Sequence, residues 1–215
     1  MTRMDPGPVL TMDQLWFSYA SRPVIRGLTG EFSPGVTWVR GANGCGKSTL
    51  LKLLAGVLEP AYGRRSINGT DAARNPLEYR RQMFWCGPGH LPMGHLKATE
   101  YFGFLRGLYP GFDTGMLAVH CRGFGLEDVL SQPIAILSTG TQRKLWLTAA
   151  LVVGTSAVLL DEPLNALDDR SLAYAQATLT ACSLGTQQAW IVASHADPCD
   201  GRAATKVLDM IGDLS

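Results

Sequence analysis

The chain has 215 residues, a formal net charge of +1, 46% apolar residues and 17% charged residues. This length fits one domain, and the apolar fraction is ample for a sizeable core, which argues against intrinsic disorder. The near-neutral charge gives no basic footprint for a nucleic-acid partner, so we expect none. The five cysteines are widely spaced and form no CxxC pair or Cys/His cluster. This pattern argues against a zinc site and a disulfide framework, and it fits a reducing cytosol.

No membrane-spanning segment is expected from the apolar pattern. The longest apolar stretch, Leu145 to Leu160, is interrupted at Thr148 and Gly154, whereas a spanning helix needs about 20 apolar residues. The first ten residues carry Asp5 and two prolines where a signal peptide needs an apolar core. If the protein works at a membrane, we expect another protein to hold it there.

The N-terminal part of the chain predicts short strands followed by a helix. Apolar segments bounded by turn residues predict strands at 15–17, 24–25 and 36–39. Residues 48–58 predict a helix, because their leucines fall on one face and Pro60 lies just beyond the end. Residues 63–69 predict a short strand that ends in the turn pair Asn68–Gly69.

The C-terminal part predicts helices alternating with buried strands. Helices are expected at 98–108, 113–130, 140–153 and about 169–183. The continuous apolar runs 157–160 and 190–193 suit parallel strands that are buried on both faces. The last strand–helix–strand unit makes the overall prediction an α/β fold.

Residues 41–48 match the phosphate-binding pattern G-x-x-x-x-G-K-[ST] in full, between an expected strand and an expected helix. Glycines let backbone N–H groups turn inward around a phosphate, and the helix N-terminus adds its positive end. In this pattern Lys47 reaches the β and γ phosphates, and the Ser48 hydroxyl takes a Mg²⁺ position. The residues expected around the nucleotide are Gly41, Ala42, Asn43, Gly44, Cys45, Gly46, Lys47, Ser48 and Thr49. A glycine-rich turn without a ligand is the alternative, and the loop alone leaves a kinase, a GTPase and an ATPase open.

Polar residues follow two of the buried strands. Asp161 and Glu162 end the run 157–160, and His195 follows the run 190–193. Ligands of open α/β sheets bind at strand ends, so Asp161 is expected in the Mg²⁺ shell and Glu162 is expected to activate the attacking water. His195 is expected to hydrogen-bond the γ phosphate and this water together. A solvated acidic turn and a half-exposed histidine at a loop start are the alternatives. Glu162 favours a hydrolase, because a kinase must position an acceptor hydroxyl instead of water.

Residues 137–144, Leu-Ser-Thr-Gly-Thr-Gln-Arg-Lys, resemble the LSGGQ signature of ATP-binding cassette (ABC) proteins. In that family the donors at this helix N-terminus, here Ser138 and the Gly140 amide, serve the nucleotide held by the other subunit. Residues 164–168 are similar to the family's D-loop, which adds Asp168 to the expected nucleotide site. Tyr19 stands where the family places an aromatic ring that stacks on adenine, with packing inside the β lobe as the alternative.

Together these motifs cover residues 15–195 in family order. The resemblance implies an α/β fold with a P-loop NTPase (RecA-like) core, in a single ABC ATPase domain over residues 1–215. It also implies an antiparallel β lobe at about 9–39 and 60–70 and a helical lobe at about 88–135. ATP and Mg²⁺ are the implied cofactors, with catalysis by Glu162, His195 and Lys47 and the metal at Ser48 and Asp161.

The resemblance also implies partners. ABC ATPases form head-to-tail dimers on ATP binding, here with a second copy or with another ABC ATPase. Residues 89–105 are similar to small exporter ATPases, including the haem-exporter subunit of cytochrome c maturation, and residues 138–167 resemble peptide and drug exporter ATPases. The implied function is to power export through a separate membrane-spanning subunit, from the cytoplasm at the inner face of the cell membrane. A soluble ABC ATPase without a transport role is the alternative.

Two positions depart from the family pattern. The family has a Gln after the strand at 83–86, where this chain has Pro88, which can neither ligate Mg²⁺ nor hydrogen-bond water through its side chain. His90 and Gln82 are the candidates to supply that contact instead. Thr141 stands where the signature has its Gln. Both changes concern the coupling between lobes rather than the nucleotide site itself.

Overall fold

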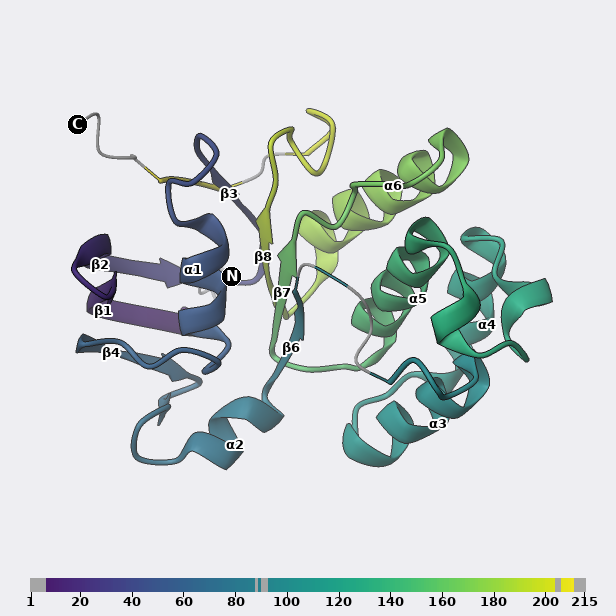
Figure 1. Cartoon of the computed structure of the whole chain (residues 1–215), viewed down its shortest axis with the longest axis horizontal. Helices are drawn as coiled ribbons and strands as arrows, with labels where there is room; N and C mark the ends of the chain where they lie inside the picture. The colour runs from purple at the N-terminus through teal and green to yellow at the C-terminus, as the bar shows by residue number, and fades with distance from the viewer. Residues whose placement is uncertain (1–6, 88, 90–92, 204–205, 211–215) are drawn as a thin grey trace, which may run out of the picture.

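The computed structural model describes residues 7–87, 89, 93–203 and 206–210, which form two sheets flanked by helices (Figure 1). The strands are β1 (Leu10–Tyr19), β2 (Arg22–Phe32), β3 (Gly35–Arg40), β4 (Tyr62–Ile67), β5 (Thr70–Asp71), β6 (Met83–Cys86), β7 (Ala157–Asp161), β8 (Ala189–Ala193) and β9 (Lys206–Asp209). The helices are α1 (Lys47–Leu54), α2 (Pro76–Arg81), α3 (Ala98–Leu108), α4 (Thr114–Gly123), α5 (Thr139–Val152) and α6 (Asp169–Gly185). Two 3₁₀ turns, η1 (Glu127–Val129) and η2 (Ile134–Ile136), connect α4 to α5. None of these described helices is both long enough and apolar enough to cross a bilayer.

The centre of the molecule is a five-stranded sheet in the order β6-β7-β8-β3-β9, with parallel pairing throughout. Both β7 and β8 are buried along their whole length, because helices cover the two faces of the sheet. Ala157 and Leu159 share one core cluster with the leucines of α1, whereas Val158 and Leu160 share the other with α5 and α6. Figure 1 shows this layering, with α1 on one side of β7 and β8 and with α5 and α6 on the other.

The second sheet is antiparallel, in the order β2-β1-β4-β5, and packs its buried residues against α1. The expected β lobe at 9–39 and 60–70 is therefore wrong in one part, since residues 35–39 belong to β3 in the parallel sheet. The physical reason is the pairing of β3 with β8 and β9, strands that lie far away in the sequence. β3 thus connects the antiparallel sheet to the phosphate loop, which precedes α1.

Two expected helices are shorter than their apolar patterns suggest. The helix expected at 48–58 ends at Leu54, because Ala55 caps it and Gly56 adopts a left-handed conformation with φ of 67°. Leu58 still packs on the core, but from beyond the helix. The helix expected at 113–130 ends at Gly123 as α4, and the chain then turns through Gly125, φ 65°, into η1. α3 and α4 both pack on α5 and are the two α-helices in the described part of residues 88–135.

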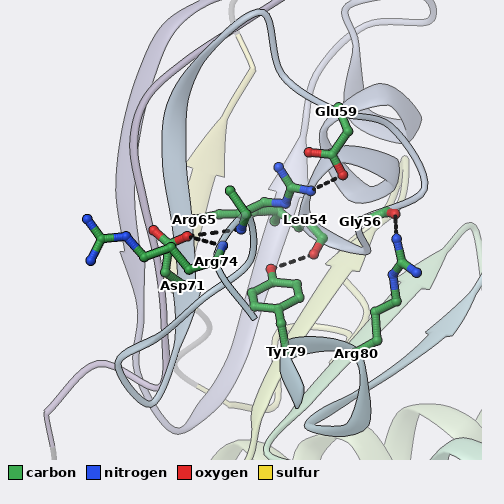
Figure 2. A network of polar contacts seen from close by, with 9 residues as sticks. Leu54, Gly56, Glu59, Arg65, Asp71, Arg74, Tyr79 and Arg80 are labelled. Carbon is green, nitrogen blue, oxygen red and sulfur yellow. Dashed lines mark hydrogen bonds and ion pairs between the residues drawn. The ribbon is translucent and has the colours of Figure 1, made fainter. Parts of the chain in front are cut away.

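A partly buried polar network connects the C-terminal end of α1 to the antiparallel sheet (Figure 2). The Tyr79 hydroxyl donates to the Leu54 carbonyl oxygen at 2.6 Å, which satisfies one of the open acceptors at the helix end. Arg65 on β4 is only 4% exposed, lies over the Tyr79 ring and donates to Glu59 at 3.0 Å. Because α1 starts at the phosphate loop, these contacts hold the helix behind that loop in one orientation.

Candidate functional site

The phosphate loop connects β3 to α1, as the motif predicts. Gly46 is the N-cap of α1 with φ of 103°, and a Cβ built on it would lie 2.9 Å from Val24 of β2. Only glycine tolerates both the backbone angle and this close approach. Ala42, Asn43 and Gly44 are exposed at the outer side of the loop, while Cys45 and Thr49 are buried beneath it. The first backbone N–H groups of α1 have no partner within the helix, as at any helix start, and such groups favour an anion.

Lys47 is held inside the curve of the loop. Its side chain is 7% exposed, and its Nζ donates to the carbonyl oxygens of Gly41 at 2.8 Å and Ala42 at 3.3 Å. A cation in this position attracts phosphate strongly, because the surrounding protein limits screening by water. The expected role of Lys47 as the phosphate-binding cation thus has a matching geometry.

Asp161 ends β7 as a buried carboxylate beside the start of α1. It is 1% exposed, and its Oδ2 has no hydrogen-bond partner among the described residues. Burial raises the pKa of Asp161 above its usual value, while a hydrogen bond from Ser48 and the nearby Lys52, Arg143 and Lys47 act to lower it. A buried carboxylate oxygen without a partner, next to a hydroxyl, is a donor set that hard divalent cations prefer. Ser48 and Asp161 therefore fit the Mg²⁺ ion that the sequence predicts at this position.

Glu162 and His195 come together at the ends of two neighbouring strands. The Glu162 amide donates to the carbonyl oxygen of Ala193 at 2.8 Å, and its carboxylate Oε1 lies 3.3 Å from His195 Nε2. Glu162 has a φ of 49°, a left-handed conformation that is costly for a residue with a Cβ and is typical of functional sites. Both side chains remain partly exposed, at 22% for Glu162 and 53% for His195, so water can reach them. The pair can share a water molecule at this edge of the sheet.

Ser138 and Gly140 lie away from the phosphate loop of their own chain. They stand at the start of α5, which packs on the opposite face of the parallel sheet from α1. Ser138 is the N-cap, and its Oγ accepts from the Thr141 amide at 3.1 Å. A Cβ on Gly140 would lie 2.5 Å from the carbonyl oxygen of Ala166, so the signature helix rests directly on the expected D-loop.

Asp168 acts as a structural cap within this chain. It is the N-cap of α6, accepts from the amide and the hydroxyl of Ser171 at 2.9 and 3.0 Å, and pairs with Lys144 of α5 at 2.6 Å. These contacts, led by Lys144, hold the pKa of the Asp168 carboxyl far below its usual range. Its expected role at the nucleotide therefore competes with its contacts to two helices of its own chain.

Tyr19 lies at the end of the β1–β2 hairpin and is 46% exposed. Its ring packs edge-to-face on Phe17, with centroids 4.9 Å apart. The same hairpin touches the phosphate loop through Val24, which lies against Gly46. The exposed ring of Tyr19 thus lies on the β1–β2 hairpin, which adjoins the phosphate loop, and its face can stack on a planar group.

The structure tests only one of the residues that could replace the family's Gln after β6. Pro88 and His90 lie outside the described residues. Gln82 precedes β6, where its carbonyl accepts from the Ala157 amide at the start of β7 and its side chain donates to Thr70. Gln82 therefore lies at the start of β7, whereas Asp161 lies at its end. The prediction that Gln82 replaces the missing Gln as a contact to Mg²⁺ or its water is wrong. The sequence analysis assigned no role to Arg143 and Lys144, although both lie in the segment 137–144 that resembles the signature.

Comparison with known proteins decides the family. A family model described as ABC transporter matches residues 25–165. The chain belongs to the ABC transporter family. It is 36% identical over 171 residues to the cytochrome c biogenesis ATP-binding export protein CcmA of Cupriavidus pinatubonensis, covering 78% of this chain and 75% of the relative. The protein of the same name from Idiomarina loihiensis is 36% identical over 172 residues, covering 79% and 78%.

A solved structure supports the same assignment. An ATP-binding subunit of an ABC transporter superposes on this ABC ATPase with a TM-score of 0.79 at 25% identity, covering 87% of this chain and 79% of the other. The expected α/β P-loop NTPase fold is confirmed, as is the assignment of the chain as an ABC-type ATPase. As an ABC ATPase, the chain binds ATP.

Proposed function

We propose that the ABC ATPase hydrolyses ATP at the ends of β3, β7 and β8, with five side chains in distinct roles. Lys47 binds the β and γ phosphates, and Ser48 and Asp161 hold Mg²⁺, which screens the phosphate charge when it is bound. Glu162 takes the proton of the attacking water, and His195, 3.3 Å from that carboxylate, orients the same water and the γ phosphate. The observation that carries this proposal is the unpartnered, buried Oδ2 of Asp161 beside Ser48.

The proposed active unit is a head-to-tail dimer that contains two such sites. Support comes from the position of Ser138 and Gly140 on an exposed helix start, away from the phosphate loop of their own chain. N–H groups at a helix N-terminus favour an anion, so this end of α5 is suited to the phosphates of a nucleotide on a partner subunit. The partner is a second copy of this chain or another ABC ATPase.

The proposed transport role adds a membrane-spanning partner. Relatives carry the name of an export protein for cytochrome c biogenesis, and we assign this chain the same step at the inner face of the cell membrane. A pocket of about 380 Å³ between α3 and α4 offers a contact surface for that partner. Apolar side chains make up much of its wall, including Phe102, Phe112, Leu117 and Leu130.

A hydrolysis assay tests the first part. The purified protein should release phosphate from Mg-ATP, and Glu162→Gln should stop release while leaving ATP binding intact, because an amide does not accept the proton. Glu162→Gln should also accumulate a dimer with Mg-ATP in size-exclusion chromatography. Glu78→Gln on the exposed side of α2 is the matched control and should behave as wild type. Rapid hydrolysis by Glu162→Gln would contradict the assigned base.

A genetic assay tests the transport role. Deleting the gene should abolish haem-stained c-type cytochromes, and wild type but not Glu162→Gln should restore them. A polytopic membrane protein should co-purify with wild type and be lost with Leu117→Glu in the α3–α4 pocket. Normal cytochromes after deletion would leave the ATPase standing and reject this export step. The absence of any membrane partner would favour a non-transport ABC ATPase.

A further inference from the structure

Arg143 is a buried cation on the signature helix α5 that neither the motif nor the proposed roles account for. The residue is 8% exposed, and among the described residues it forms no ion pair with a carboxylate. Its Nη1 donates to the Gly87 carbonyl oxygen at 3.4 Å, and its guanidinium lies 5.1 Å from the centroid of the Trp146 ring. A buried arginine stays charged, so this positive charge must be compensated by its surroundings.

Burial lowers the pKa of the Arg143 guanidinium, and the acidic end of β7 offsets part of this effect. Arg143 interacts electrostatically with both Asp161 and Glu162, and these carboxylates favour its charged form against the effect of burial. Because the group lies inside the protein, this longer-range attraction is screened much less than it would be at the surface.

The Gly87 contact adds a second connection. Gly87 follows β6 directly, and a Cβ built on it would lie 2.5 Å from the Trp85 ring, so its backbone is tightly packed where it presents the carbonyl to Arg143. β6 pairs with β7 up to the register Cys86–Leu160, one residue before Asp161. The guanidinium therefore lies where α5, the end of β6 and the acidic end of β7 meet.

We propose that Arg143 is a positioning residue for ATP hydrolysis, which holds the end of β6 and the Asp161–Glu162 pair in register with the signature helix. This inference rests on the proposed roles of Asp161 and Glu162. It assigns Arg143 no contact with nucleotide. Its effect is to keep the Glu162 carboxylate at the place where the attacking water must stand, and a small displacement of such a group is costly to the rate.

Two variants separate positioning from stability. Arg143→Met keeps much of the length and the apolar contact with Trp146 but removes the charge, and no carboxylate among the described residues loses a direct ion-pair partner. We expect kcat to fall roughly 10- to 100-fold, with KM for ATP and the melting temperature little changed. Arg143→Lys keeps the charge and should recover part of the lost kcat. The control is Arg81→Met on α2, whose side chain is 74% exposed, and it should match wild type.

The outcomes are distinct. Wild-type kcat in Arg143→Met would overturn the inference and leave the proposed function intact. A loss of kcat that accompanies a large fall in melting temperature, with no recovery in Arg143→Lys, would assign Arg143 a structural role and overturn the inference as well. No hydrolysis by the wild-type protein would contradict the proposed function first. A selective loss of kcat in Arg143→Met with recovery in Arg143→Lys supports positioning.

Discussion

Gly140→Ala should separate the signature helix from the D-loop without unfolding the protein. The new methyl group would lie 2.5 Å from the Ala166 carbonyl oxygen, whereas ordinary contact begins at 3.4 Å, so one of the two segments must move by about 0.9 Å. Overpacking of this kind costs about 1–3 kcal/mol. Alanine in a helix is better than glycine by about 1 kcal/mol, which offsets part of that cost. The net loss should thus be about 0–2 kcal/mol, or at most about 8 °C in melting temperature.

The effect on function should exceed the effect on stability. If Ser138 and the Gly140 amide complete a site on a partner subunit, a shift of this size should lower the ATPase rate roughly 10- to 100-fold. The monomeric variant should still bind ATP at its phosphate loop. Calorimetry at a protein concentration low enough to prevent dimerisation measures this binding. The control is Gly107→Ala on α3, where a new Cβ meets nothing within 4 Å and both rate and stability should be kept. A wild-type rate in Gly140→Ala would refute the reasoning about the signature helix.

Three further changes test other parts of the molecule. Tyr79→Phe removes the donor at the C-terminal end of α1 and should cost about 1–3 kcal/mol in chemical denaturation, whereas Tyr62→Phe, at a tyrosine that is 75% exposed, should cost little. Burial lowers the pKa of His120 below its usual value of 6.5, so the unfolded chain takes up the proton first and stability should fall as the pH drops from about 7.5 to 5.5. His120→Gln should reduce this fall in thermal melts, and His95→Gln at an exposed histidine should not; equal pH profiles would contradict the assignment. Lys47→Met should weaken ATP binding roughly 10- to 150-fold in calorimetry, since a charge-assisted hydrogen bond contributes about 1.5–3 kcal/mol, and unchanged affinity would contradict the phosphate role.

Motifs whose residues are consecutive in the sequence could be assigned to a strand, loop or helix from the sequence alone, because these elements follow one another directly. The phosphate loop is of this kind, and so is the pair Asp161–Glu162 at the end of an apolar strand. The meeting of Glu162 with His195 was predictable in outline, since parallel strands end at the same edge of a sheet. The chemical roles of these residues stay predictions until the variants are measured.

Contacts between distant elements could not be predicted in the same way. The pairing of β3 with β8 and β9 depends on strands more than 140 residues away, so the β lobe implied by the family resemblance was extended too far, to residue 39. The pair Lys144–Asp168 joins two helices, and neither residue alone signals the other. Arg143 could be recognised as unusual only once its burial was known, because a basic residue on a helix is ordinarily exposed.

The position of β3 has a consequence for how the protein is made. β3 runs directly into the phosphate loop, yet both of its neighbours, β8 and β9, belong to the last part of the described chain. The ion pair between Arg40 and Asp209 spans 169 positions of sequence. During synthesis on the ribosome, the antiparallel sheet can pair early, but β3 must wait for almost the whole chain to emerge before its edges are covered. The nucleotide site is thus among the last parts to form, and a truncated nascent chain would expose a bare strand instead of binding ATP.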